Sequence, residues 1–176
     1  MMNRSFRNIF PAVAFFTIVF VFGCDNPFSV YKNPQNKIKI KYPKTWKVIE
    51  NKDGAAAIFI SPKETVLDAY QENLSIVIQN LPQSLMPLKQ YSKEAVNQIT
   101  QTLKNIQVVR SEETSLSESP AYRFEYIIKL NFNLKITHVW TIINNKTYQL
   151  TFGCDMDHCK DYENFARTMF ATFEVQ

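Results

Sequence analysis

The stretch AYRFEYIIKLNFNLKITHVWTIINNKTYQLTF, residues 121–152, decides the fold because apolar side chains recur at every second position in three successive runs. This period is typical of β-strands with a buried face. The alternating residues are Tyr122, Phe124, Tyr126 and Ile128, then Leu134, Ile136, His138, Trp140 and Ile142, and finally Tyr148, Leu150 and Phe152. Asn-rich turns at residues 131–133 and 144–146 separate the runs, so the stretch predicts an antiparallel meander.

Shorter strands are expected closer to the N-terminus. Ile38, Ile40 and Tyr42 share one face of an alternating run, and lysines share the other. Further strands are expected at residues 46–49, 55–60 and 74–78. Residues 25–36 are polar, contain two prolines and show no period, which indicates a tether. Residues 111–119 are rich in Ser and Glu and are expected to form a loop.

Two segments have the helical period. The apolar stripes consist of Leu88, Tyr91, Ala95, Val96, Ile99 and Leu103, and of Tyr162, Phe165, Ala166, Met169 and Phe170. Pro87 suits the entry of the first helix, and Asp161 is the expected N-cap of the second. The pattern therefore predicts an α+β domain, an antiparallel sheet with one strongly buried face flanked by helices.

The N-terminus resembles the signal of bacterial lipoproteins. Arg4 and Arg7 precede an apolar run over residues 9–22, which ends in the sequence VFGC at residues 21–24. A membrane-spanning helix needs about 20 apolar residues, and this run is shorter. We therefore expect residues 1–23 to be a signal peptide, Cys24 to carry acyl chains such as palmitate, residues 24–35 to be a tether, and residues 36–176 to form the domain.

Composition limits the function classes. Removal of residues 1–23 leaves 153 residues, enough for one domain, and lowers the formal charge from +4 to +2. This balance gives no reason to expect nucleic acid as a partner. We expect a monomer on the exported side of the cell membrane, periplasmic or lumenal. His138 lies on the apolar side of its predicted strand. This position favours a hydrogen-bonded core histidine over a catalytic base.

Residues 154–159 gather groups that could bind a metal ion. With Cys24 acylated, Cys154 and Cys159 remain as an even pair in an oxidising compartment, which favours a disulfide. Alternatively, their thiolates and His158 could bind zinc. As a third possibility, the disulfide forms while Asp155, Asp157 and His158 weakly hold calcium, manganese or zinc. No cofactor is required by any of these interpretations except the zinc site.

A basic stripe follows the tether. Residues 32–52 contain seven lysines and one acid, Glu50, and the stripe includes Lys37, Lys39, Lys41, Lys44 and Lys47. These side chains could contact anionic headgroups or an acidic partner. Equally, they could form a solvated face that keeps an edge strand from pairing with other chains.

Several landmarks resemble the PsbP-like domain family over residues 35–176. The sequence IKYPKTW at residues 40–46 is similar to that family's aromatic-Pro-x-x-Trp strand exit. Residues 121–126 resemble its middle strand, residues 140–152 the following hairpin, and residues 173–175 its ending. The resemblance implies an α/β/α sandwich, the fold shared with the Ran-binding nuclear import factor, and carries no catalytic signature.

Taken together with the N-terminal signal, the resemblance favours a lipid-anchored, non-enzymatic protein that binds or assembles an unidentified protein partner in the cell envelope through its basic strand and exposed sheet edges. An alternative is the extrinsic subunit of the photosystem II oxygen-evolving complex, with calcium or manganese contacts. Residues 54–62 depart from the photosynthetic pattern, however, because they replace its Gly-Pro-Asp-type strand. A third possibility is a metal-dependent envelope enzyme that uses Asp155, Asp157 and His158.

Overall fold

The computed structural model describes residues 26–66, 68–81 and 86–176. Cys24 and the predicted signal peptide lie outside the described residues. The elements in chain order are β1 (Phe28–Asn33), β2 (Ile38–Pro43), β3 (Lys47–Lys52), β4 (Ala55–Ile60), β5 (Asn73–Asn80), α1 (Leu88–Thr102), β6 (Ile106–Leu116), β7 (Ser119–Lys129), β8 (Asn133–Ile143), β9 (Lys146–Asp155), α2 (Cys159–Thr172) and β10 (Glu174–Val175). Among these described elements, no helix is long and apolar enough to cross a membrane.

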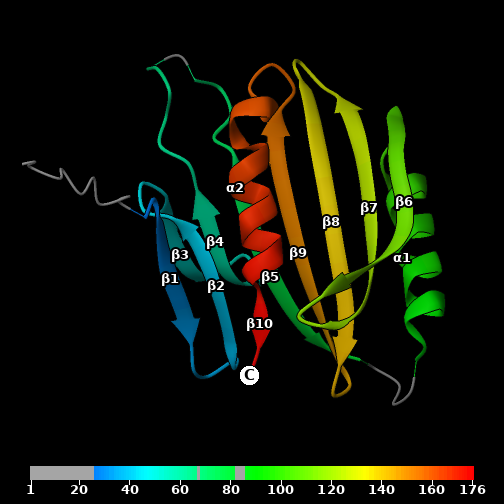
Figure 1. Cartoon of the computed structure of the whole chain (residues 1–176). Helices are drawn as coiled ribbons and strands as arrows, with labels where there is room; N and C mark the ends of the chain where they lie inside the picture. Colours follow the sequence, from blue (N-terminus) through cyan, green and yellow to red (C-terminus); the bar gives the residue numbers. More distant parts are fainter. Residues whose placement is uncertain (1–25, 67, 82–85) are drawn as a thin grey trace, which may run out of the picture.

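The strands form two sheets. The larger has seven strands in the order β3-β4-β5-β9-β8-β7-β6, and the smaller has three in the order β1-β2-β10; neighbouring strands are antiparallel. Figure 1 shows α1 behind the β6–β7 end of the large sheet, and α2 in front of its middle. The helix α2 also packs on β2 of the small sheet. This arrangement confirms the α+β prediction.

The large sheet buries apolar side chains on both faces, as the expected α/β/α sandwich requires, but the apolar sets of its strands do not all share one face. Phe124 of β7 lies opposite His138 of β8, so the apolar sets of these two strands share the face covered by α1. On β9, however, Leu150 lies opposite Val139, which alternates with His138 and Trp140 and therefore points to the other face of β8. The apolar set of β9 therefore faces α2, in the larger core cluster. Alternation identifies a buried face on each strand but does not show that neighbouring strands bury the same one.

A two-residue turn fixes the register of the β8–β9 hairpin. Asn144 and Asn145 both have positive φ, 51° and 61°, as a type I′ turn requires. Ser117 and Glu118, with φ of 52° and 57°, form the equivalent turn between β6 and β7. The loop predicted at residues 111–119 is wrong, because β6 extends to Leu116 as an edge strand whose side chains are mostly exposed. Such a strand shows no apolar period.

Two other element boundaries differ from the prediction. Residues 28–33, expected within a tether, form β1, in which Tyr31 lies opposite Ile40 of β2. The strand was missed because its exposed Val30 breaks the alternation. The final helix begins at Cys159, and His158 rather than Asp161 is its N-cap, without a side-chain capping hydrogen bond. Asp161 lies instead in the first turn, where its charge is favourable to the helix dipole.

Candidate binding pocket beside the disulfide

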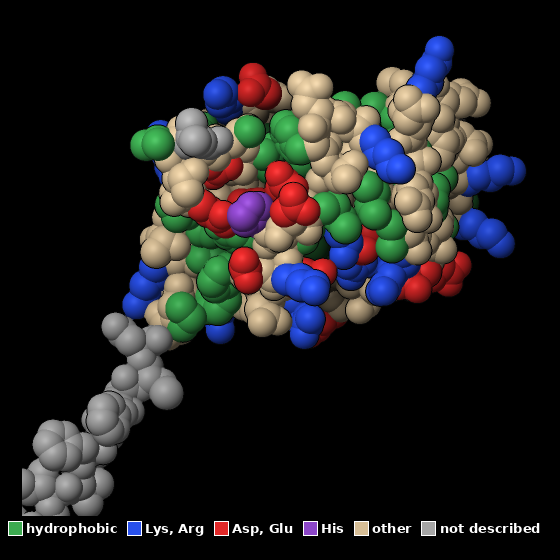
Figure 2. Space-filling model, turned by 90° about the horizontal axis from the view of Figure 1, so that it is seen from above, with side chains coloured by type: hydrophobic (Ala, Val, Ile, Leu, Met, Phe, Trp, Pro, Cys, Tyr) green, Lys and Arg blue, Asp and Glu red, His purple; other side chains and the backbone are tan. Residues whose placement is uncertain are grey.

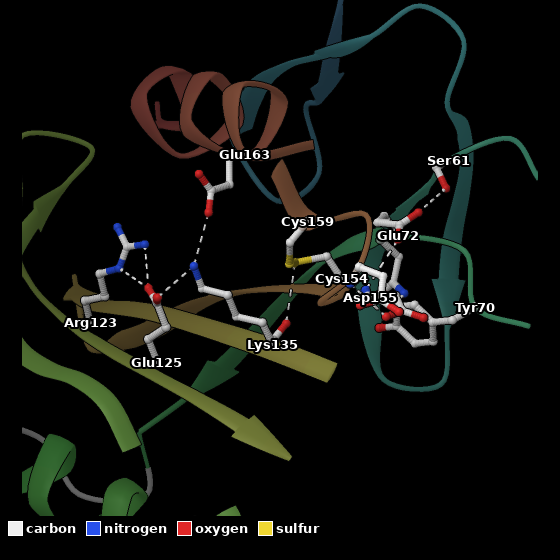
Figure 3. The surroundings of a disulfide bond; sticks show 12 residues. Ser61, Tyr70, Glu72, Arg123, Glu125, Lys135, Cys154, Asp155, Cys159 and Glu163 are labelled. Atoms are coloured by element: carbon white, nitrogen blue, oxygen red, sulfur yellow. Dashed lines mark hydrogen bonds and ion pairs between the residues drawn. A yellow bond between two sulfur atoms is a disulfide. The ribbon is translucent and has the colours of Figure 1, made fainter. Parts of the chain in front are cut away.

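Cys154 and Cys159 form the predicted disulfide. Cys154 lies near the end of β9 and Cys159 is the first residue of α2, with their Cα atoms 5.3 Å apart. Both side chains are buried, and Figure 3 shows the bond between them. The bond therefore fixes the start of α2 against the sheet.

The structure does not gather Asp155, Asp157 and His158 around one point. Oδ1 of Asp155 accepts a hydrogen bond from the backbone N–H of Asp157 at 3.1 Å, whereas Nδ1 of His158 lies 2.8 Å from Oε2 of Glu64. Within the described ranges, no group of three or more His, Cys, Asp or Glu side chains could hold a metal ion. The two sulfurs are bonded to each other and supply no thiolate ligand. Weak cation binding by the oxidised protein stays a prediction.

Acidic residues attach the segment of residues 61–72 to the disulfide turn. Glu64 accepts a hydrogen bond from the Tyr162 hydroxyl at 2.9 Å, and burial together with this bond raises the pKa of Tyr162. The carboxylate of Glu72 accepts hydrogen bonds from the Ser61 hydroxyl at 3.3 Å and the Asp155 N–H at 3.4 Å. Burial raises the pKa of Glu72. Figure 2 shows acidic side chains gathered around a histidine, with basic side chains beside them.

A pocket of about 490 Å³ lies between α2 and the strands β6, β7 and β8, and Cys154 forms part of its wall. The helix α2 packs on β2 and β9. The positions of β7 and β8 that line the pocket include the charged residues Arg123, Glu125 and Lys135. The charged side chains that line it are Arg110, Arg123, Glu125, Lys135, Glu163 and Arg167. Four bases against two acids give the pocket an excess of positive charge.

Glu125 lies at the centre of an ion-pair network in this pocket (Figure 3). Its side chain is 3% exposed, and its carboxylate lies 2.8 Å from Nη2 of Arg123 and 3.1 Å from Nζ of Lys135. Lys135 also pairs with Glu163 of α2 at 3.2 Å. Burial alone would raise the pKa of Glu125, but hydrogen bonds and charge from Arg123 and Lys135 hold that pKa below its ordinary value.

Sequence reasoning missed this network. Arg123 and Glu125 occur in the positions of β7 that alternate with Tyr122, Phe124 and Tyr126. Charges at such positions are usual on a solvated face, so the alternation alone does not indicate a buried network. Glu125 alone had a usable signal, since a carboxylate between two aromatic residues on a central strand is expected to find a cation.

The basic stripe is placed differently from the prediction. Its strand β2 is central in the small sheet, between β1 and β10, so the interpretation of a protective edge strand is wrong for β2. Lys39 pairs with Glu174 at 2.9 Å. Lys37, Lys41 and Lys44 are exposed, as is Lys47 on β3, which is an edge strand of the large sheet.

His138 is a core residue, as predicted. Its side chain is 8% exposed, and Nδ1 lies 2.9 Å from the hydroxyl oxygen of Thr151. Nε2 lies 3.3 Å from the Tyr126 hydroxyl. Burial lowers its pKa from 6.5 to about 4. A histidine with these partners is suited to stabilise the sheet.

The family model of PsbP matches residues 26–175, and the chain belongs to this family. Similar solved structures include cyanobacterial PsbP (CyanoP) from Synechocystis sp. PCC 6803, with 17% identity, a TM-score of 0.59, and coverage of 88% of this chain and 96% of that one. LpqN of Mycobacterium tuberculosis, described as involved in cell envelope biogenesis, has 13% identity and a TM-score of 0.64, with 86% of each chain covered. The Ran-binding protein Mog1p of Saccharomyces cerevisiae has 9% identity and a TM-score of 0.58, with coverage of 84% and 95%. No curated protein sequence matches the chain.

Proposed function

We propose that this PsbP-family chain is a lipid-anchored, non-enzymatic protein on the exported side of the cell membrane, where its domain binds a protein partner. The predicted acylation of Cys24 supports the location. LpqN is described as involved in cell envelope biogenesis and Mog1p as binding Ran, so proteins of this fold include one linked to the making of an envelope and one that binds a protein.

The observation that carries the proposal is the short distance along the chain between Cys24 and β1. The strand β1 begins at Phe28, four residues after Cys24. Four extended residues span at most about 14 Å. A lipid on Cys24 would therefore hold the small sheet close to the headgroups.

The charge on the small sheet suits this position. Lys32 of β1 lies opposite Lys39 of β2, and the neighbouring Lys41 is exposed on the same face. Basic side chains at a membrane surface are each worth about 1 kcal/mol with anionic lipids. In Figure 1, β6 lies at the opposite end of the molecule from β1, which leaves the β6 edge free to meet a partner.

The anchor is tested by mass spectrometry of the N-terminal peptide and by membrane fractionation of the Cys24→Ala variant. Acyl chains on Cys24, and release of the variant into the soluble fraction, are expected. A wild-type chain that keeps residues 1–23 uncleaved would overturn the anchor.

The orientation is tested by acetylation of lysines in the full chain reconstituted into vesicles. Lys32 and Lys41, which are exposed on this face of the small sheet, should be protected in anionic vesicles compared with zwitterionic ones, whereas Lys104, Lys129 and Lys160, which are also exposed, serve as controls. Equal labelling of both groups would contradict a membrane-facing small sheet.

The partner is tested by crosslinking in the native membrane. The crosslinked proteins are compared between two variants of equal charge. One has Lys104, Lys129 and Lys160 changed to Glu, and the other has Lys37, Lys41 and Lys47 changed to Glu. A reproducible crosslinked protein that contacts β6 is the expected result. Crosslinks to lipid alone, or the absence of any crosslinked protein, would contradict the proposed protein partner.

A further inference from the structure

We infer that the charged pocket between α2 and strands β6–β8 binds a small organic dianion, with two carboxylates or one phosphate monoester beside an apolar group. This site goes beyond the proposed function and does not depend on it. The pocket has the size of ordinary ligand sites, which run from about 300 to 1,000 Å³.

The inner part of the pocket is already neutralised. Arg123 and Lys135 face the carboxylates of Glu125 and Glu163, so two bases meet two acids. Because Glu125 is buried and its pKa is held low, it stays ionised at neutral pH and keeps both cations in place. This network gives the pocket a rigid polar floor.

Two guanidinium groups remain for a ligand. Arg110 lines the pocket from β6 and Arg167 lines it from α2, on separate walls. Arg110 meets Glu112 through one contact of 3.3 Å, with both side chains about half exposed, and such pairs contribute little. In the part of the chain that the structure describes, Arg167 has no ion pair. Two such charges match a dianion, and guanidinium groups bind carboxylate and phosphate through paired hydrogen bonds.

The remaining lining is apolar enough to hold a hydrocarbon group. Leu116 and Val139 are buried at the pocket wall, and Phe170 of α2 is partly exposed into it. Ala166 and Ala171 leave space beside α2 because their side chains are small. An apolar group next to the acidic groups would lie against these residues.

The test is isothermal titration calorimetry of the full chain in detergent with four probes. Phenyl phosphate and benzylsuccinate are the two dianions, phenylacetate is the monoanion, and benzyl alcohol is the uncharged control for partition into detergent. Both dianions, or one of them, should bind more tightly than phenylacetate, and benzyl alcohol should give no saturable signal. The dianion with the higher affinity shows whether the pocket prefers a phosphate monoester or a dicarboxylate.

Two variants localise the binding. The double variant Arg110→Gln and Arg167→Gln should weaken dianion binding by about tenfold or more, because a hydrogen bond to a charged group is worth at least that much. Both positions are exposed, so the fold should persist. Ala171→Trp fills the pocket while leaving every charge in place, and it should also weaken binding. Lys160→Gln on α2 lies outside the pocket lining and should bind as the wild type does.

Three results would overturn the site. These are saturable binding by none of the charged probes at millimolar concentration, dianion binding that the double variant retains in full, and equal affinity for benzyl alcohol. Circular dichroism of each variant separates loss of binding from loss of fold.

Discussion

Trp140 of β8 donates its indole Nε1–H to the hydroxyl oxygen of Ser92 on α1 over 2.8 Å. The exposed fractions of these side chains are 1% and 2%. Water therefore does not reach either group. The bond joins α1 to the centre of the large sheet and satisfies the buried indole N–H.

Ser92→Ala should lower the free energy of unfolding by about 1–3 kcal/mol, because the indole N–H of Trp140 is left buried without an acceptor. Urea denaturation followed by tryptophan fluorescence measures the change. The matched control is Ser111→Ala, which removes an exposed hydrogen bond of 2.8 Å to the Tyr122 hydroxyl and should change stability little. Equal losses of stability in both variants would show that the burial of Trp140 does not cause the destabilisation.

The meander of β7, β8 and β9 could be predicted because each strand has one apolar side and each turn has its own residue signal. The Asn144-Asn145 pair tolerates positive φ, so the turn and the register follow from local chemistry. Alternation alone does not show which face β9 buries. That face follows only when the turn is limited to Asn144 and Asn145 rather than residues 144–146, because a two-residue turn pairs Ile143 with Lys146 and therefore Val139 with Leu150.

The pocket was beyond sequence reasoning for a related reason. Arg110, Glu125 and Arg167 belong to three elements. Their side chains line one pocket only because the fold places α2 opposite β6 and β7. The disulfide was easier to predict, because Cys154 and Cys159 are close in sequence and no other cysteine competes once Cys24 is acylated. A single sequence holds no comparable signal that residues far apart along the chain lie close together in the fold.

Cys154→Ser together with Cys159→Ser should lower the free energy of unfolding by about 2 kcal/mol, the chain-entropy value for a loop this short. Equilibrium unfolding of the variant and of the wild type with and without a thiol reductant measures it. The reductant should destabilise the wild type and leave the double variant unchanged. A wild type insensitive to the reductant under unfolding conditions would contradict the prediction.

Glu125→Gln should reduce stability at about pH 7 by about 1–3 kcal/mol, less than for a fully buried ion pair because Arg123 and Lys135 are partly exposed. The folded pKa of Glu125 lies below its unfolded value near 4.5, so its contribution is complete above that pH and is lost as the pH falls through the folded pKa. The variant should lack this part of the acid dependence. Glu113→Gln, an exposed change on β6, is the control and should keep it.

His138 should make the protein less stable as the pH falls from about 6.5 to about 4. Burial lowers its folded pKa to about 4 from 6.5, so over this window the unfolded chain binds a proton that the folded chain does not. The loss reaches about 3 kcal/mol at most, since each pKa unit corresponds to 1.36 kcal/mol. His138→Gln keeps hydrogen-bonding groups without titrating, and its free energy of unfolding should be flatter across the window. Nitrogen NMR of the imidazole measures the folded pKa directly, and a midpoint at 6.5 or above would contradict a neutral, buried His138.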